Sequence, residues 1–519
     1  MSAGFRPGEP IAIELRGLSA HELVAWQLED VVASVRVDAQ PLVLLPPLPE
    51  GGYYVEARTG ANVVAQTAVD VRRNPLSRPR YGFVADFSPA RDVRGVVENA
   101  RRLHLNALQF YDWMYRHASL VPPQEEFDDP LGRRLSLDTV RALAHRLAGA
   151  GALPLGYAAV YAVGRDEWPQ WRDAGLYQAD GCPWTLGDDF LWLVDPSDDR
   201  WLEHFTAELW RAVDAVDFAG FHLDQYGAPK RALRSDGAIV NLASAFPRLI
   251  ESVRAAVPGA RLVFNNVNNF PTWATARTSQ DATYIEVWPP HTQLEHLARL
   301  VEDARAAARK PVILAAYLSV FADAPEEQAL NAARFVMATV FSHGGSHLLA
   351  GEDGAVLVDP YYPRNHRVGP EALQVLRRWY DFAVSYGDLL YDDVQDVTRS
   401  LVGGINEDLR VHADVPVAVD AEPGSVWVRA VQTPHGLVVH LIDLSQATEL
   451  EWDAPKPASV TRTDTRLEVL TTTGATRIAV ASPEAGPRLT PVDVELDGPY
   501  ARAVLPPWQT WAVVLVRDP

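Results

Sequence analysis

Two short apolar runs of this sequence end on a carboxylic acid. The run over residues 220–224 ends on Asp224, and the run over residues 282–286 ends on Glu286. An unpaired carboxylate is costly to bury inside a core strand, so an acid placed where a strand ends is expected to face a cleft. Two carboxylic acids that face one cleft are the groups that cleave a glycosidic bond. The structural alternative for each acid is a buried salt bridge to an arginine at the rim of the fold.

Polar and aromatic residues follow other apolar runs in the same way. Sugar rings pack their C–H faces on aromatic planes, which favours Trp113 and Trp288 as sugar platforms. The substrate-binding candidates are Tyr111, Asp112, Trp113, Tyr157, His222, Gln225, Asn265, Asn266, Trp288, Glu352 and Asp353. Several of them also have a structural interpretation. Asp112 can pair with Arg116 or His117. The two asparagines can cap a turn. Glu352 and Asp353 precede a glycine and can belong to a turn.

The elements that must position these side chains follow a repeating order of strand, loop and helix from residue 81 onward. The candidate strands are 81–86, 105–111, 152–158, 219–223, 261–265, 282–286, 311–316 and 346–350. Amphipathic stretches between them predict helices over 93–103, 137–149, 201–216, 243–256, 294–308 and 328–341. Eight strands alternating with helices predict a (β/α)8 TIM barrel, whose active sites lie at the carboxyl ends of the strands. A doubly wound sheet would need a glycine-rich turn after its first strand, and residues 81–88 have none.

Strand-like alternation returns on both sides of this region. Before it, residues 10–73 alternate in short runs separated by turns, which predicts an immunoglobulin-like β-sandwich. After about residue 390, similar runs predict a closing β-sandwich, and residues 74–80 are expected to form a linker. The predicted domains are an N-terminal sandwich over 1–78, a catalytic barrel over 79–388 and a C-terminal sandwich over 389–519.

Three segments resemble a known family. Residues 111–117 (Tyr-Asp-Trp-Met-Tyr-Arg-His), 220–225 (Gly-Phe-His-Leu-Asp-Gln) and 359–363 (Asp-Pro-Tyr-Tyr-Pro) look like glycoside hydrolase family 66, the dextranases and cycloisomaltooligosaccharide glucanotransferases. The resemblance implies cleavage of α-1,6-glucan linkages with retention of configuration. It also implies that Asp224 is the nucleophile, that Glu286 is the acid/base, and that the C-terminal domain is a Greek-key sandwich.

These implied roles require different protonation states. Asp224 would attack the anomeric carbon as an ion, while Glu286 would first give its proton to the leaving oxygen and then take one from water. We expect hydrogen bonds from His222 or Gln225 to keep Asp224 ionised, and repulsion between the acids to raise the pKa of Glu286. Carboxyl groups roughly 5–5.5 Å apart would fit retention, and about 6.5–9.5 Å would indicate inversion.

Charge and composition limit the partners. The formal net charge of -20 argues against nucleic acid and anionic membrane surfaces, but a neutral sugar is unaffected by it. Cys182 is the single cysteine, so neither a disulfide within the chain nor a cysteine metal site is expected. We expect no metal, no cofactor, and a monomer or weak homo-oligomer. The N-terminus lacks a signal pattern, so a cytoplasmic location is expected, or secretion if the sequence has lost its signal.

The sequence therefore predicts a dextranase-like retaining hydrolase that acts on the α-1,6 linkages of an α-glucan oligosaccharide or polysaccharide. The glucanotransferases of the family carry a carbohydrate-binding module inserted in the barrel, and no stretch here is long enough to hold one, which favours hydrolysis. The missing signal points to imported oligosaccharides. Two alternatives stay open. One is a transglycosylase or cyclising glucanotransferase acting on the same substrates, and the other is a non-catalytic carbohydrate-binding protein with a relic barrel.

Overall fold

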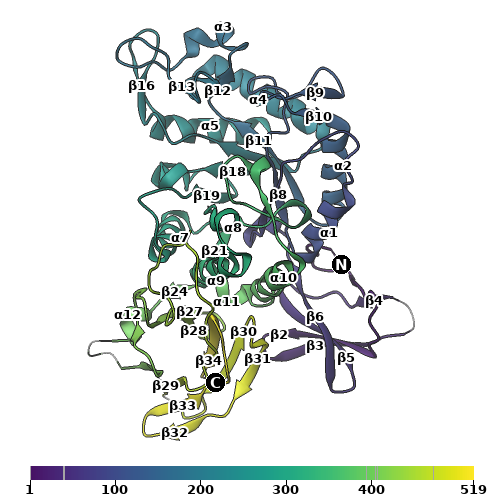
Figure 1. The fold of residues 1–519 in the computed structure, drawn as a ribbon, viewed down its shortest axis with the longest axis vertical. Coiled ribbons are helices and arrows are strands. Elements are labelled where there is room, and N and C mark those ends of the chain that lie inside the picture. The colour runs from purple at the N-terminus through teal and green to yellow at the C-terminus, as the bar shows by residue number, and fades with distance from the viewer. Residues whose placement is uncertain are drawn as a thin grey trace.

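The centre of the molecule is a barrel of eight parallel strands (Figure 1). The computed structural model describes residues 2–38, 41–392, 394–403, 405, 407–471 and 473–518. The barrel strands are β7 (Tyr81–Val84), β8 (Ala107–Phe110), β11 (Leu153–Ala159), β15 (Gly220–Asp224), β18 (Arg261–Asn265), β19 (Ala282–Glu286), β20 (Val312–Ala315) and β21 (Gly345–His347). Each predicted strand is present within a few residues of its expected bounds, and the predicted fold class is confirmed.

The first and last strands of the barrel lie against each other. The hydroxyl of Ser346 on β21 donates to the backbone carbonyl of Pro79, just before β7. The carboxylate of Glu352, beyond β21, accepts the backbone N–H of Ala85 at 3.1 Å. These contacts close the ring of strands around a buried core.

The strand register brings the predicted acids to one edge. β15 pairs with β18 so that Leu223 lies opposite Phe264, and Asp224 therefore stands level with Asn265. β18 pairs with β19 so that Asn265 lies opposite Tyr284. Glu286 follows two residues later, on the same face of its strand as Tyr284. The three polar side chains thus meet at the carboxyl ends of three adjacent strands.

Helices cover the outside of the barrel. They are α1 (Arg94–Arg102), α2 (Leu137–Ala148), α4 (Asp199–Val216), α5 (Leu242–Ala256), α7 (Leu294–Ala308), α9 (Glu326–Ser342) and α10 (Pro370–Ser385). Side-chain caps stabilise the start of several of them: Ser136 accepts the N–H of Thr139 before α2, Asp198 that of Trp201 before α4, and Asn241 that of Ala243 before α5. Between β18 and β19 lie only two short elements, the turn η3 (Val267–Asn269) and the helix α6 (Thr272–Thr275).

A long insertion follows β11 on the carboxyl side of the barrel. It contains β12 (Ala162–Gly164), α3 (Trp168–Trp171), β13 (Thr185–Leu186) and β14 (Leu191–Leu193), which form a small sheet in the order β12-β14-β13. In Figure 1 the insertion lies at the end of the molecule opposite both flanking sheets. It delivers the side chain of Leu186 to the barrel opening.

Antiparallel sheets precede the barrel. The strands are β1 (Ile11–Glu14), β2 (Glu22–Gln27), β3 (Asp30–Arg36), β4 (Leu42–Leu45), β5 (Gly51–Thr59) and β6 (Asn62–Val71). β1 pairs with β4, while the other four form a sheet in the order β3-β2-β5-β6. Apolar side chains of both sheets, including Ile11, Leu23, Tyr53 and Val69, form a shared core.

Two sheets follow the barrel, and their strands are antiparallel except where β26 pairs with β27. The main one contains β24 (Gln395–Asp396), β26 (Val417–Ala418), β27 (Val426–Thr433), β28 (Gly436–Asp443), β30 (Arg477–Ser482), β31 (Gly486–Val492) and β34 (Trp511–Arg517). The smaller one contains β25 (Leu409–His412), β29 (Arg466–Leu470), β32 (Glu495–Asp497) and β33 (Tyr500–Val504). An ion pair of 2.9 Å between Arg517 and Glu29 ties this region to the N-terminal sheet, beside which it lies in Figure 1.

The prediction that residues 74–80 form a linker needs a correction. It contains the turn η1 (Pro75–Ser77), and Arg78 is almost completely buried. The Arg78 guanidinium binds the carboxylates of Asp388 and Asp392, and that of Arg80 binds Asp70. Because its arginines are buried and paired, this segment packs tightly between the N-terminal sheets and the barrel. Its prolines had suggested an exposed linker instead.

Candidate active site

A cavity of about 450 Å³ opens at the carboxyl ends of the barrel strands. We call it the barrel cavity. Eight of the thirteen residues predicted from sequence line it: Tyr111, Tyr157, His222, Asp224, Gln225, Asn265, Glu286 and Trp288. The structure thus brings both predicted acids and most of the predicted binding residues into one space of a size typical for a small ligand.

Asp224, the last residue of β15, is held by neutral donors. The hydroxyl of Tyr157 donates to its Oδ2 at 2.8 Å. The amide nitrogen of Asn265 donates to its Oδ1 at 2.7 Å. Both oxygens of the carboxylate are therefore fixed by side chains of neighbouring strands.

Glu286, the last residue of β19, is held in the same manner. Its Oε1 accepts the hydroxyl of Tyr317, which follows β20, at 2.8 Å. Its Oε2 accepts the same Asn265 amide nitrogen at 2.9 Å. Because one nitrogen reaches both acids, Asp224 Oδ1 and Glu286 Oε2 lie no farther apart than the sum of these distances, 5.6 Å. That limit lies below the separation of about 6.5–9.5 Å found in inverting pairs.

Among the described residues, neither Asp224 nor Glu286 has an arginine, lysine or histidine within ion-pair distance, and their side-chain donors are neutral. The arginine salt bridge considered from sequence is therefore not formed there. Burial raises the pKa of both carboxyl groups, and the charge of Glu286 raises that of Asp224 further. Two buried, mutually repelling acids hold their protons as a pair, and one of them stays protonated to higher pH.

The prediction that His222 or Gln225 donates to Asp224 was wrong for both side chains. His222 points its Nδ1 to the Tyr81 hydroxyl at 3.0 Å, and burial lowers its pKa to about 3, so the ring is neutral. The Gln225 side chain donates to the backbone carbonyls of Asn265 and Phe270 instead. Gln225 favours the ionised form of Asp224 through its backbone only. Tyr157 and Asn265, which supply the side-chain donors, were not predicted in that role.

Five of the predicted residues lie outside the barrel cavity. Two of them belong to the turn after β8. Asp112 has a φ of 50°, which turns the chain, and its nearest cation is Arg133 at 3.9 Å, not the expected Arg116 or His117. Burial raises the pKa of Asp112 to about 7. Trp113 is completely buried and donates to the backbone carbonyl of Tyr157 at 3.1 Å, so it is a core residue and cannot be a sugar platform.

The other three are held by local contacts. Asn266 is completely buried and bonds to the backbone carbonyls of Phe264 and Tyr284. Glu352 and Asp353 form ion pairs of 2.7 Å with Arg91, which fixes the turn after β21. The turn after β21 agrees with the structural interpretation of Glu352 and Asp353, whereas Asn266 makes no side-chain cap bond at the turn that follows it. None of the three placements supports substrate binding.

A group of tyrosines in the cavity was missed. Tyr317, Tyr361 and Tyr362 line it together with Tyr284, whose hydroxyl lies 3.0 Å from that of Tyr362. The Tyr362 ring stacks on Tyr111 with 4.2 Å between centroids. Tyr317 was detectable by the rule used for the acids, because it follows a barrel strand directly. Trp288, one third exposed, lies 5.7 Å from the Tyr317 ring and keeps its predicted place beside the acids.

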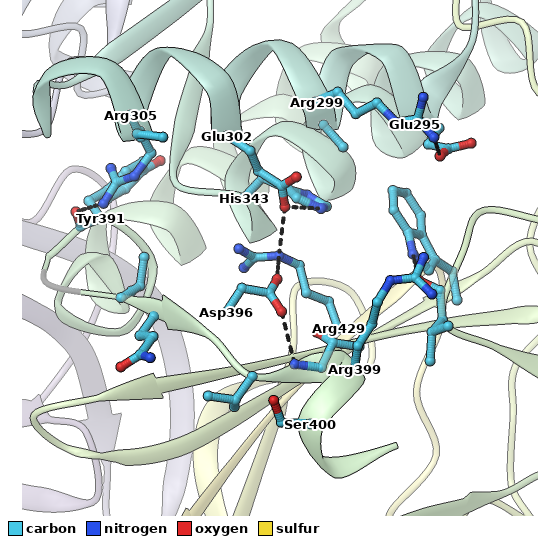
Figure 2. A pocket seen from close by; sticks show the side chains of 18 of the residues that line it. Glu295, Arg299, Glu302, Arg305, His343, Tyr391, Asp396, Arg399, Ser400 and Arg429 are labelled. Carbon is cyan, nitrogen blue, oxygen red and sulfur yellow. Dashed lines mark hydrogen bonds and ion pairs between the residues drawn. The ribbon is translucent and has the colours of Figure 1, made fainter. Parts of the chain in front are cut away.

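A larger cavity of about 1260 Å³ lies elsewhere, between α7 and the C-terminal region. We call it the junction cavity. Figure 2 shows Arg429 of β27 between Glu302 of α7 and Asp396 of β24. The Arg429 Nε lies 3.0 Å from Asp396 and 3.7 Å from Glu302, and its side chain is buried. Here the carboxylates are paired with a cation, which is the arrangement of a structural joint.

The described part of the chain contains no group of three or more histidine, cysteine, aspartate or glutamate residues that could hold a metal ion. None of its helices is long and apolar enough to cross a membrane.

Known proteins resemble the chain along most of its length. Residues 40–515 match the model of a family described as Glycosyl hydrolase family 66. Two cycloisomaltooligosaccharide glucanotransferases of Niallia circulans are 25% and 26% identical over 296 and 345 residues, which are 52% and 61% of this chain and 31% and 35% of theirs. The aligned part thus spans about a third of these relatives.

Solved structures show the same fold. A Paenibacillus sp. cycloisomaltooligosaccharide glucanotransferase, complexed with cycloisomaltoheptaose, superposes with a TM-score of 0.88 at 19% identity and covers 99% of this chain and 98% of its own. An α-amylase of Geobacillus thermoleovorans, complexed with acarbose, gives a TM-score of 0.57 at 10% identity and covers 86% of this chain and 100% of its own. At these identities the likeness concerns the fold alone.

Proposed function

The chain belongs to glycosyl hydrolase family 66, and we propose that it is a retaining enzyme that acts on α-1,6-glucosidic linkages of dextran or isomalto-oligosaccharides. The observation that carries the proposal is the pair of strand-end acids, Asp224 and Glu286, which share one amide donor within 5.6 Å and have no cation partner in the described structure. Such a pair is expensive to bury, and catalysis is the established reason to keep one.

The proposed reaction has two steps. Asp224 attacks the anomeric carbon, while Glu286 gives its proton to the oxygen of the departing sugar, leaving a glycosyl ester on Asp224. Glu286, now ionised, takes a proton from an incoming water, and the water oxygen displaces Asp224. The neutral donors Tyr157 and Tyr317 hold the outer oxygen of each acid through both steps.

The cavity walls fit a neutral sugar. Tyr111 and Trp288 present aromatic surface, and Leu186 of the insertion adds an exposed apolar wall. Sugar C–H faces pack on such surfaces. The described residues that line the cavity include no arginine or lysine, so they offer no cation that would bind a phosphate or carboxylate ligand.

Transfer to another sugar is the second candidate, and a specific observation favours it. The solved Paenibacillus chain named as a glucanotransferase matches this one over 98% of its length. The lack of an inserted module therefore does not separate hydrolysis from cyclisation. We propose hydrolysis as the main reaction, with transfer to a sugar hydroxyl as the alternative fate of the same intermediate.

A panel of linear α-glucans with α-1,4, α-1,6 and α-1,3 linkages tests the proposal. Expected are products from α-1,6 substrates only, with the α configuration when first released. Linear products support hydrolysis, and cyclic or elongated products support transfer. A protein that binds isomalto-oligosaccharides but cuts none of the panel would be a binding protein with a relic barrel, and the proposal would be lost.

A further inference from the structure

Asn265 makes an unusual pair of contacts in the barrel cavity. Its amide nitrogen has two hydrogens, and each is used, one toward Asp224 Oδ1 at 2.7 Å and one toward Glu286 Oε2 at 2.9 Å. Its amide oxygen is buried and has no hydrogen-bond partner within the described structure. Both N–H groups of the Asn265 side chain therefore bind the two acids, and neither remains for another ligand in the cavity.

This arrangement excludes the substrate-binding role predicted for Asn265. A sugar hydroxyl would need a free N–H or an accessible amide oxygen, and the side chain offers neither. Reversing the amide would place its oxygen against two carboxyl oxygens, which is repulsive unless both acids carry protons there. The observed orientation requires that Asp224 Oδ1 and Glu286 Oε2 act as acceptors, so neither of these two oxygens carries a proton toward the amide.

We propose that Asn265 is a positioning residue that joins the two acids and confines the transferable proton to Glu286 Oε1, the oxygen beside Tyr317. The inference rests on the proposed function, because that function assigns the proton to Glu286. The Asn265 amide nitrogen can only donate, whereas the Tyr317 hydroxyl can rotate and accept, so a proton can stand on Oε1 beside Tyr317 but not on Oε2 toward the amide. From Oε1 the proton reaches the leaving group. Asp224 keeps its inner oxygen proton-free for the same reason.

Most of the other titratable groups around the two acids stay neutral while the acids titrate. The surrounding phenols remain neutral, because burial raises their pKa values: Tyr81, Tyr111, Tyr157, Tyr226, Tyr284, Tyr317 and Tyr362. Burial keeps His222 neutral as well. Asp112, at the end of β8 beside Arg133, is the exception, since burial raises its pKa to about 7. Its contribution to a pH profile must be measured separately.

The experiment compares Asn265→Ala with Asn266→Ala over a range of pH. Asn266 is a matched control, because it is a neighbouring buried asparagine that bonds only to Thr275 and backbone carbonyls. An amide donor favours the ionised form of a carboxyl group, so its loss raises the pKa of the acids. In Asn265→Ala we expect the acid limb of kcat/KM to move up by about one pH unit, with kcat reduced about 10- to 100-fold and KM changed less than about threefold.

Two further variants sharpen the result. Asn265→Asp places a third carboxyl group against the pair and is expected to move the acid limb further upward than Asn265→Ala. Asp112→Asn is expected to leave the acid limb of the Asn265 variants displaced by the same amount. An acid limb that follows Asp112 instead would overturn the inference.

The other possible outcomes also decide the role of Asn265. A large rise in KM with an unmoved acid limb would make Asn265 a substrate-binding residue. Equal losses of Tm and kcat in the Asn265 and Asn266 variants, with unmoved limbs, would make it merely structural. If the wild type cuts no glucan, the proposed function fails, and a carboxyl carbon NMR titration of wild type against Asn265→Ala still tests the coupling. Identical titrations of the Asp224 and Glu286 carboxyls in the two proteins would overturn it.

Discussion

In the barrel cavity Asp224 and Glu286 face each other with only neutral donors around them, whereas in the junction cavity Glu302 and Asp396 flank the guanidinium of Arg429. Both regions place two carboxylates within reach of a shared nitrogen donor. In the first the donor is an amide, which leaves the charges uncompensated. In the second it is a cation, which neutralises one of the two charges.

The difference shows which features identify an active site. The junction cavity is the larger one, yet its two acids have an arginine partner at ion-pair distance. The barrel cavity is smaller, and its acids repel each other in a buried place. Uncompensated charge, rather than cavity size, distinguishes the region suited to acid–base chemistry.

The largest expected effect separates the two regions by activity. Asp224→Asn removes the proposed nucleophile and is expected to lower kcat by at least about 10⁴-fold. Asp396→Asn, the matched change in the junction cavity, is expected to leave kcat within about twofold. Initial rates on an isomalto-oligosaccharide check both. Comparable losses in the two variants would remove the distinction between the cavities.

The next effect concerns Glu286, the proposed general acid. Glu286→Gln is expected to lower kcat by about 10²–10⁴-fold on a natural linkage, while Glu302→Gln stays near wild type. The first step of the Glu286 variant should recover on a glucosyl fluoride, because fluoride leaves without a proton. Burst kinetics with that substrate give the measurement. No recovery would argue that Glu286 acts in some other way than as the acid.

A smaller effect on stability is expected in the junction cavity. Arg429→Met leaves Glu302 and Asp396 without their buried cation. Their side chains are 43% and 41% exposed, and water screens much of the repulsion, so we expect a loss of about 1–3 kcal/mol in the free energy of unfolding. Urea unfolding measures it, with kcat per folded molecule unchanged. An unaltered midpoint would show that the ion pairs do not hold this joint.

The smallest effect is a gain of stability at the active site. Burial and the charge of Glu286 raise the pKa of Asp224 in the folded state above the ordinary value of 3.8. The protonated acid therefore favours folding at low pH, and that contribution is lost as pH rises through the folded-state pKa. Asn cannot ionise, so Asp224→Asn should exceed wild type in unfolding free energy by about 1–2 kcal/mol at pH 8 and by less at pH 5. Asp396→Asn should show no such gain, and a pH-independent difference would contradict the repulsion.

The strand pattern was sufficient to place the barrel and the acid pair. Alternating strands and helices located all eight barrel strands, and strand ends located Asp224, Asn265 and Glu286 at one edge. The same rule failed at Asp112, where a φ of 50° turns the chain away and sends Trp113 into the core. A strand end predicts where the chain arrives, but the direction of the next side chain depends on the turn that follows.

Partners were harder to predict than positions. Nothing in the sequence indicated that Arg91 would bind Glu352 and Asp353, because the three residues are far apart in the chain. The donor roles of Tyr157 and Tyr317 were likewise not predicted, because a tyrosine near a strand end does not show which acid its hydroxyl will reach. Such contacts depend on the closure of the barrel, which brings distant strands together.

The most direct test of the account is to locate the glycosyl group on the protein. Glu286→Gln incubated with an isomaltosyl fluoride should accumulate the covalent intermediate, because the base for the second step is missing. Peptide mass spectrometry should then find the sugar on the peptide that contains Asp224, and no label in the Asp224→Asn, Glu286→Gln double variant. A sugar attached to any other residue, or a first product of inverted configuration from the wild type, would contradict the assignment of Asp224 and Glu286 as a retaining pair.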